Sequence, residues 1–182
     1  IIQLKSIKQF NSPELIVLDT MNFWIESKID ELRAVIKEVD VLIINDGEAR
    51  LLTQENNLIT AIKNIRELGP KRVIIKKGEH GAIMYNGTDF FVMPALPIET
   101  VVDPTGAGDS FTGAFCGYLS NQESFTEEAF KSAIIYGTLV SSQTIQGFGP
   151  DTLSNLTMSA IEKLYSEFLE QTVLPKLNVI SK

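Results

Sequence analysis

Two glycines and an aspartate stand together at the predicted start of a long helix, in the run Gly106-Ala107-Gly108-Asp109. The N-terminus of a helix presents backbone N–H groups without partners and carries a partial positive charge, so it can hold an anion. Glycine has no Cβ, and Gly106 and Gly108 would therefore let an anion come close to the backbone. The run predicts an anion site at the start of this helix.

Asp109 is unexpected beside such a site, because a carboxylate repels an anion. Its presence is explained if Asp109 is a general base that takes a proton from a substrate hydroxyl next to an incoming phosphate. The backbone N–H groups would then stabilise negative charge on the transferred group. A purely structural interpretation is also open, in which Asp109 caps the helix, the glycines shape a turn, and Phe111 and Phe115 lie in the core.

The composition excludes several other kinds of site. The 182 residues include 16 Lys and Arg and 23 Asp and Glu, a net charge of −7, which argues against nucleic acid or an anionic membrane as the main partner. A single cysteine, Cys116, excludes an internal disulfide, and a single histidine, His80, excludes a Cys/His zinc cluster. No apolar run approaches the ~20 residues that span a bilayer, and the first residues do not resemble a signal peptide. We therefore expect a cytoplasmic protein.

Short apolar runs that alternate with amphipathic segments predict an α/β architecture. Residues 14–19, 41–44 and 72–76 have the continuous apolar character of buried parallel strands. With short connections, this alternation predicts one domain over residues 1–182, a parallel sheet flanked by helices. The other predicted elements are helices at residues 26–39, 48–53, 58–68, 110–119, 126–143 and 157–168, and a hairpin of residues 82–85 and 89–92 with a type I′ turn at Asn86-Gly87.

Two further motifs follow predicted strands. Asn45-Asp46-Gly47-Glu48 comes after the second strand, and Lys76-Lys77-Gly78-Glu79-His80-Gly81 begins at the end of the third. Taken alone, Asn45 is interpreted as a helix cap with Glu48 in the first turn, and the two glycines of the later motif as ordinary turn residues.

Together with residues 103–109 (Asp-Pro-Thr-Gly-Ala-Gly-Asp), these motifs resemble the ribokinase-like (PfkB) family of carbohydrate and nucleoside kinases. The matching family patterns are Asp-x-Thr-Gly-Ala-Gly-Asp, Asn-x-x-Glu and Lys/Thr-x-Gly-x-x-Gly, and they occur here in the family's order. The resemblance covers most of the chain. It implies a three-layer ribokinase-like fold and ATP-dependent phosphoryl transfer to a hydroxymethyl group of a sugar or nucleoside.

The resemblance also implies roles for the residues of the late motif. Asp109 matches the family's catalytic base, and Gly106-Ala107-Gly108 matches the anion hole for the transferred phosphate. Asp103 and Thr105 match a loop that in several members binds a monovalent cation such as K⁺. Residues 142–147 would form the opposite wall of the cation and adenine region.

The two earlier motifs match residues that handle the nucleotide. Asn45 and Glu48 match the pair that organises Mg²⁺, its waters and the ATP phosphates, with Glu48 acting on the metal through water. The residues that match a loop along the nucleotide are Lys76, Lys77, Gly78, Glu79, His80 and Gly81.

The chain departs from the family pattern in two places. Many sugar kinases of the family carry Asp-x-Asn followed by an arginine, whereas here Asn22 comes one place late and no arginine follows. No substrate role is therefore assigned to Asp19 or Asn22. The family's sugar-recognition residues and β-sheet lid lie upstream of every motif found here, so we expect a C-terminal portion without the N-terminal part and the lid. An unpaired sheet edge would then favour a homo-oligomer.

Other functions are weighed against this one. A non-catalytic nucleotide-binding remnant is the main alternative, because the acceptor-binding half is absent from the sequence. A Rossmann dehydrogenase is disfavoured, since no Gly-x-Gly-x-x-Gly follows the first strand. A serine hydrolase is disfavoured by the lack of a Gly-x-Ser-x-Gly elbow. The expected partners are ATP and a small sugar or nucleoside, without nucleic acid or membrane.

Overall fold

The computed structural model describes residues 2–173 of the chain. Its five strands form one sheet in the order β1-β2-β3-β4-β5. The parallel part comprises β1 (Val17–Asp19), β2 (Val41–Asn45) and β3 (Arg72–Lys76), and the hairpin of β4 (Ala82–Tyr85) and β5 (Phe90–Met93) adds two antiparallel strands. The predicted α/β architecture is confirmed. The sheet is mixed because a hairpin reverses the chain in a few residues, whereas a parallel neighbour needs a long crossover.

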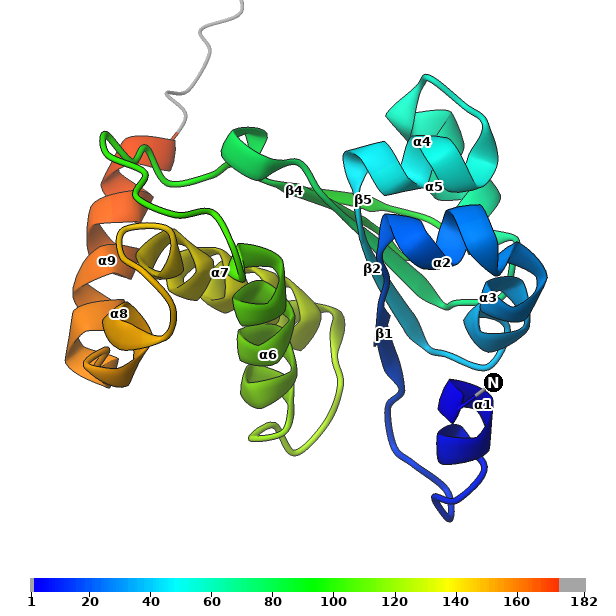
Figure 1. The fold of residues 1–182 in the computed structure, drawn as a ribbon. Helices are drawn as coiled ribbons and strands as arrows, with labels where there is room; N and C mark the ends of the chain where they lie inside the picture. Colours follow the sequence, from blue (N-terminus) through cyan, green and yellow to red (C-terminus); the bar gives the residue numbers. More distant parts are fainter. Residues whose placement is uncertain (1, 174–182) are drawn as a thin grey trace, which may run out of the picture.

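Helices cover both faces of this sheet, which gives three layers (Figure 1). One face carries α2 (Asn22–Ser27), α3 (Ile29–Ile36), α4 (Asp46–Thr53) and α5 (Leu58–Arg66). The opposite face carries α6 (Ala107–Leu119) and α7 (Glu127–Thr144), and α9 (Met158–Thr172) packs on α7. α1 (Ile2–Ile7) lies beside α3 and α8 (Asp151–Ser154) beside α7. Over residues 2–173, no helix is both long and apolar enough to cross a membrane.

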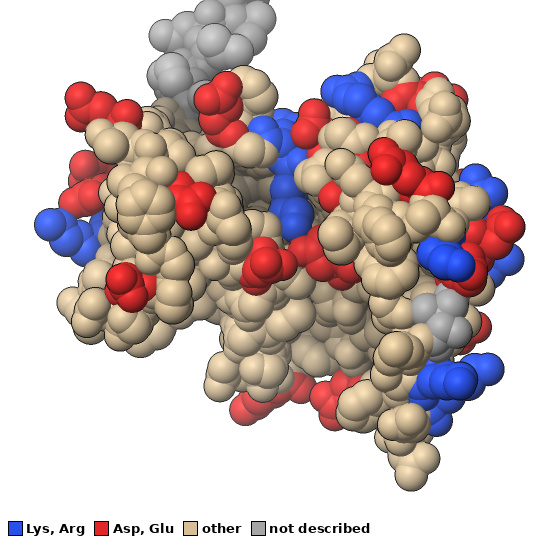
Figure 2. All heavy atoms as spheres, viewed as in Figure 1, with Lys and Arg blue, Asp and Glu red and all other residues tan. Residues whose placement is uncertain are grey.

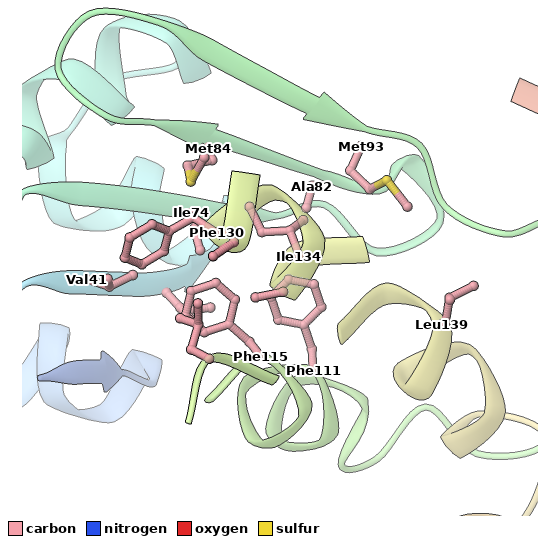
Figure 3. Close-up of a cluster of buried hydrophobic side chains, with 14 of the residues drawn as sticks. Val41, Ile74, Ala82, Met84, Met93, Phe111, Phe115, Phe130, Ile134 and Leu139 are labelled. Atoms are coloured by element: carbon pink, nitrogen blue, oxygen red, sulfur yellow. The ribbon is translucent and has the colours of Figure 1, made fainter. Parts of the chain in front are cut away.

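The two faces of the central strands explain the two hydrophobic cores. Along β2, Val41 and Ile43 point to the α6–α7 side and Leu42 and Ile44 to the α3–α5 side, and all four are fully buried. Figure 3 shows the first core, in which Phe111 and other aromatic side chains of α6 and α7 pack beneath the sheet. The continuous apolar runs of the sequence are therefore strands covered on both faces.

Among the helix boundaries that differ from the predicted ones, two have a clear local cause. The helix expected over residues 26–39 is divided at Lys28, whose backbone leaves the helical region, and the preceding part begins earlier, at Asn22. α6 begins at Ala107, three residues early, because Gly106 adopts a left-handed conformation (φ +81°) at the N-cap. Asp109 therefore lies in the first turn and is not the cap.

The β4–β5 connection is also longer than the type I′ turn predicted at Asn86-Gly87. Four residues, 86–89, separate the strands. The Asn86 side chain accepts hydrogen bonds from the backbone N–H groups of Thr88 and Asp89, at 3.0 and 2.7 Å. A side chain that mimics a backbone turn in this way favours the wider loop over the two-residue turn.

Arg72, at the amino end of β3, joins the sheet to α7. Its guanidinium pairs with Glu127 and lies 3.8 Å from the centroid of the Phe130 ring, while Asn86 donates a 3.0 Å hydrogen bond to the same carboxylate. Burial raises the pKa of Glu127, but the hydrogen bonds from Asn86 and Arg72 and the charges of Arg72 and Lys131 outweigh it and hold the pKa below its ordinary value. These contacts stabilise the folded state when Glu127 is ionised.

We expect Glu127→Ala to lower the free energy of unfolding by about 1–2 kcal/mol, because it leaves the half-buried guanidinium without its partner. A depressed pKa makes this contribution complete above the ordinary value of 4.5, and it is lost as the pH falls through the folded-state pKa. Urea unfolding at pH 7 and below pH 4 measures both effects. Glu167→Ala, which breaks the exposed Lys163–Glu167 pair, is the matched control and should change stability little; equal losses in the two variants would contradict the assignment.

Candidate functional site

Each of the three parallel strands ends in a polar residue, and the three strand ends lie along one edge of the sheet. Asp19 is the last residue of β1, Asn45 of β2 and Lys76 of β3, and Asn45 pairs in register with Lys76. The carboxyl ends of parallel strands are where open α/β sheets gather their binding residues. The N-terminus of α6 meets the same edge, because Thr112 of α6 reaches Asp19.

The Asp19 carboxylate joins three elements at this edge. Its Oδ2 accepts hydrogen bonds from Lys76 Nζ at 2.8 Å and from Thr112 Oγ1 at 2.7 Å, and its Oδ1 accepts one from the N–H of Thr20 at 2.9 Å. The Asp19 and Lys76 side chains are 23% and 17% exposed, so the ion pair is largely shielded from water. Solvent therefore screens this pair less than it screens a surface pair.

Lys76 also lies against the start of α6. A Cβ built on Gly108 would stand 2.9 Å from Lys76 Nζ, so only glycine leaves the ammonium group this space. Within the described residues, the N–H groups of Gly108 and Asp109 donate no hydrogen bond, whereas the N–H of Ala107 donates to the carbonyl of Pro104 at 3.2 Å. Two unpaired amides therefore stand in the first turn of α6 with the Lys76 ammonium beside Gly108, an arrangement that suits an anion.

Asn45 and Glu48 form a capping box at the start of α4. Asn45 Oδ1 accepts from the N–H of Glu48 at 2.8 Å, and Glu48 Oε2 accepts from the N–H of Asn45 at 3.2 Å. Glu48 is only 5% exposed. Burial raises its pKa, as does the nearby charge of Asp19, against the opposing effects of the Asn45 hydrogen bonds and the Lys76 charge. The motif therefore forms the helix cap that it predicts, and the Glu48 carboxylate in that cap is buried.

The loop after β3 lies alongside the same edge. Gly78 (φ +56°) and Gly81 (φ +83°) adopt backbone conformations that favour glycine, and a Cβ on Gly81 would stand 2.0 Å from the carbonyl oxygen of Met93. Gly81 is thus required by packing against β5. His80 is exposed, and its Nε2 lies 3.8 Å from Glu79 Oε1. The backbone N–H of Lys77 donates a hydrogen bond to the carbonyl of Gly81 across the loop.

A cleft of about 480 Å³ runs between these loops and the start of α6. Figure 2 shows basic side chains at the base of the hollow between the two helical layers and acidic ones along its rim. Among the predicted nucleotide residues, Asn45, Lys76, Gly78, Glu79 and Gly81 line the cleft, but Lys77, His80 and Glu48 do not. Its polar end includes Ala107 and Gly108, and its apolar end is lined by Ala95, Leu96, Ile98, Val101 and Ile145.

Asp109 and the residues assigned to a monovalent cation lie outside this lining. Asp109 is exposed in the first turn of α6. Asp103 Oδ1 accepts from the N–H of Thr105 at 2.9 Å, and this hydrogen bond lowers the pKa of Asp103. The N–H groups of Val102 and Asp103 both donate to the carbonyl of Ile145, which brings this loop against the end of α7.

Asp19 and Thr112, which are linked to Lys76 by hydrogen bonds, were not among the predicted site residues. Asp19 was set aside because the residues after it depart from a known pattern, although a carboxylate at the end of a buried strand was itself a signal. Thr112 follows Gly108 by four residues, one helical turn, and therefore lies on the face that meets the strand ends.

Comparison with known proteins places this arrangement in a family. The chain is 40% identical over 92 residues to a cytidine kinase of Thermococcus kodakarensis, an alignment that covers 49% of this chain and 33% of the relative. A ribokinase of Thermotoga maritima superposes with a TM-score of 0.72 at 25% identity, over 90% of this chain and 52% of that one. A ribokinase II homologue of E. coli, solved with ATP and Mg²⁺, superposes with a TM-score of 0.65 at 30% identity, over 80% of this chain and 45% of that one.

The chain thus spans a third of the cytidine kinase and about half of the two solved structures. Residues 2–157 match the family model described as pfkB family carbohydrate kinase, and the chain therefore belongs to the pfkB family of carbohydrate kinases.

Proposed function

We propose that the protein transfers the γ-phosphoryl group of ATP to a hydroxymethyl group of a sugar or nucleoside. The observation that carries this proposal is the position of the Lys76 ammonium beside Gly108 at the polar end of the cleft, at a helix start where the N–H groups of Gly108 and Asp109 are unpaired. Such a point suits a phosphate, and the apolar end suits a nucleotide base. A homologue at 30% identity was solved with ATP and Mg²⁺, which supports the same ligand here.

In this proposal Asp109 removes the proton from the acceptor hydroxyl. The hydroxyl oxygen then forms a bond to the γ-phosphorus, and the bond from that phosphorus to the β–γ bridging oxygen breaks, which releases ADP. The amides at the start of α6 and the Lys76 ammonium stabilise the charge on the transferred group. Because Asp109 is exposed and outside the cleft lining, the acceptor would approach α6 from the side opposite the nucleotide.

Glu48 and Asn45 fit a role beside Mg²⁺. Their side-chain oxygens are the hard donors that this ion prefers, and Glu48 Oε1 accepts no hydrogen bond from the described residues. Within residues 2–173 no cluster of three metal-ligating side chains occurs. This favours a Mg²⁺ bound by ATP phosphates and waters, with Glu48 holding a water. When bound, Mg²⁺ would neutralise charge on the phosphates.

We further propose that the loop of Asp103 and Thr105 holds a monovalent cation such as K⁺. The lowered pKa keeps the Asp103 carboxylate charged, and Ile145 brings the end of α7 against the same loop. The loop of Lys77, Glu79 and His80 is proposed to lie along the nucleotide. A cytoplasmic location and a homo-oligomer remain predictions.

A non-catalytic nucleotide-binding protein is the second candidate. Two observations favour it: Glu48 is already engaged in a capping box, and Asp109 does not line the cleft. ATP binding measured by calorimetry, without transfer to any sugar or nucleoside by the full-length protein, would support this candidate and contradict phosphoryl transfer.

Asp109→Asn in the full-length protein should lower kcat by about 10²- to 10⁴-fold, because the acceptor hydroxyl loses its general base. The affinity for ATP should stay within about twofold, since the amides and Lys76 are retained. Steady-state kinetics and calorimetry test both parts. Glu128→Gln, which changes an exposed acid in the first turn of α7, should leave turnover unchanged. Near-normal turnover of Asp109→Asn would remove Asp109 as the base.

Gly108→Ala tests the proposed phosphate site at the start of α6 and is expected to leave the fold intact. The added Cβ would push Lys76 Nζ aside, and losing one charge-assisted interaction should weaken ATP binding by about 10- to 100-fold. Gly113→Ala is the matched control in the same helix, because a Cβ there meets no atom within 4 Å. Gly113→Ala should be about 0.5–1 kcal/mol more stable than wild type, since alanine favours a helix, whereas Gly108→Ala should gain less because its Cβ displaces Lys76 from Asp19. Equal ATP affinities in the two variants would argue against the site.

Glu48→Gln should separate metal handling from stability. The pKa of Glu48 is raised in the folded protein, so its ionised form disfavours folding above that pKa, and stability falls as the pH rises from 4.5 through it. The glutamine variant should therefore melt at a higher temperature at pH 7 and match wild type at pH 4. It should also bind Mg-ATP more weakly. A control, Glu38→Gln, changes an exposed glutamate and should alter neither property; a lower Tm of Glu48→Gln at pH 7 would contradict the pKa argument.

A further inference from the structure

The position of Lys76 raises a physical problem. The N-terminus of a helix carries a partial positive charge, which disfavours a cation there. The Lys76 ammonium nevertheless lies close to Gly108 in the first turn of α6. A lysine side chain is also flexible and loses rotamer entropy when it is fixed. Some other group must therefore hold it at this place.

Asp19 is that group. Its Oδ2 lies 2.8 Å from Lys76 Nζ, and the carboxylate is itself fixed by Thr112 Oγ1 and the backbone N–H of Thr20. These contacts join β1, β3 and α6, from positions 57 and 93 residues apart in the sequence. The carboxylate offsets the helix charge and fixes the direction in which the lysine points.

Asp19 does not face the nucleotide cleft, although Lys76 does. A carboxylate would repel phosphate, and both of its oxygens are already engaged. Asp19 can therefore act on a phosphate only through Lys76. The negative charge of Asp19 by itself would weaken nucleotide binding, whereas its placement of Lys76 would strengthen it. The two effects of Asp19 therefore have opposite signs and can be told apart.

We infer that Asp19 and Thr112 are positioning residues that hold the Lys76 ammonium at the start of α6, where it meets the phosphoryl group in transfer. This inference rests on the proposed function. Asp19, which lies outside the motif matches, thereby becomes a residue on which turnover depends. Thr112 has the same role through the hydroxyl group that it donates to Asp19.

The kinetic test uses Asp19→Asn in the full-length protein, with ATP as the probe nucleotide. Misplacing Lys76 should lower kcat by about 10- to 100-fold. The KM for ATP should rise, as expected for Gly108→Ala, because the ammonium no longer meets the phosphates, whereas removal of the Asp19 charge alone would lower it. Lys76→Met should be at least as impaired, and the double variant should be no worse than Lys76→Met alone. A wild-type kcat for Asp19→Asn, or additive losses in the double variant, would overturn the inference.

Thr112 provides a milder pair of variants should Asp19→Asn fail to fold. Thr112→Val keeps the shape but loses the hydroxyl and should lower kcat by several-fold, roughly the worth of one hydrogen bond. Thr112→Ser keeps the hydroxyl and should restore the wild-type kcat. A serine variant as impaired as the valine variant would show a packing role and contradict positioning.

Asp40→Asn is the matched control for loss of an ion pair. Asp40 lies 2.8 Å from Lys71 and accepts a 2.9 Å hydrogen bond from the N–H of Ile16, but it precedes β2 at the other end of the sheet. It should lower the Tm and leave kcat unchanged. If Asp40→Asn and Asp19→Asn lower kcat alike, Asp19 acts only through stability and the inference fails.

A crystal structure of Asp19→Asn distinguishes failure of this inference from failure of the proposed function. If Lys76 Nζ moves away from Gly108, Asp19 positions it even where the wild-type protein proves inactive as a kinase. If the ammonium stays in place, Asp19 does not position it, whatever the activity.

Discussion

A cation held at the positive end of a helix is the interaction on which the site depends. Lys76 stands against Gly108 because Asp19 supplies the opposite charge and glycine supplies the space. The fold makes this possible, since parallel strands bring the ends of β1 and β3 to one edge and α6 begins at the same edge. Without that topology, residues so distant in sequence would not meet.

The fold class followed from the sequence because apolar runs of strand length report burial on both faces. Local turns were less predictable. Asn86-Gly87 alone favours a tight turn, but the Asn86 side chain binds two backbone N–H groups of a longer loop. The start of α6 likewise depends on the left-handed backbone of Gly106, which the helical pattern of the following residues does not reveal.

Motif residues were easier to predict than their partners. Asn45, Lys76 and Gly108, which come from three different motifs, line the same cleft. Asp19 and Thr112 carry no motif of their own, and their importance comes from tertiary contacts with residues far along the chain. Gly81 shows the converse, since packing against Met93 accounts for it without any ligand. A motif thus marks where chemistry is placed, while the contacts that hold it there depend on the whole fold.

The ion pairs between distant elements also divide the molecule into two edges. Lys71–Asp40 and Arg72–Glu127 lie at the amino edge of the parallel strands, and in residues 2–173 Lys76–Asp19 is the single such pair at the carboxyl edge. At the amino edge Arg72–Glu127 joins the sheet to α7, and at the carboxyl edge Asp19 joins β1 and β3 to α6 beside the cleft. Because the Arg72–Glu127 and Lys71–Asp40 pairs lie at the far end of the strands from the cleft, substitutions around the cleft leave these two pairs intact.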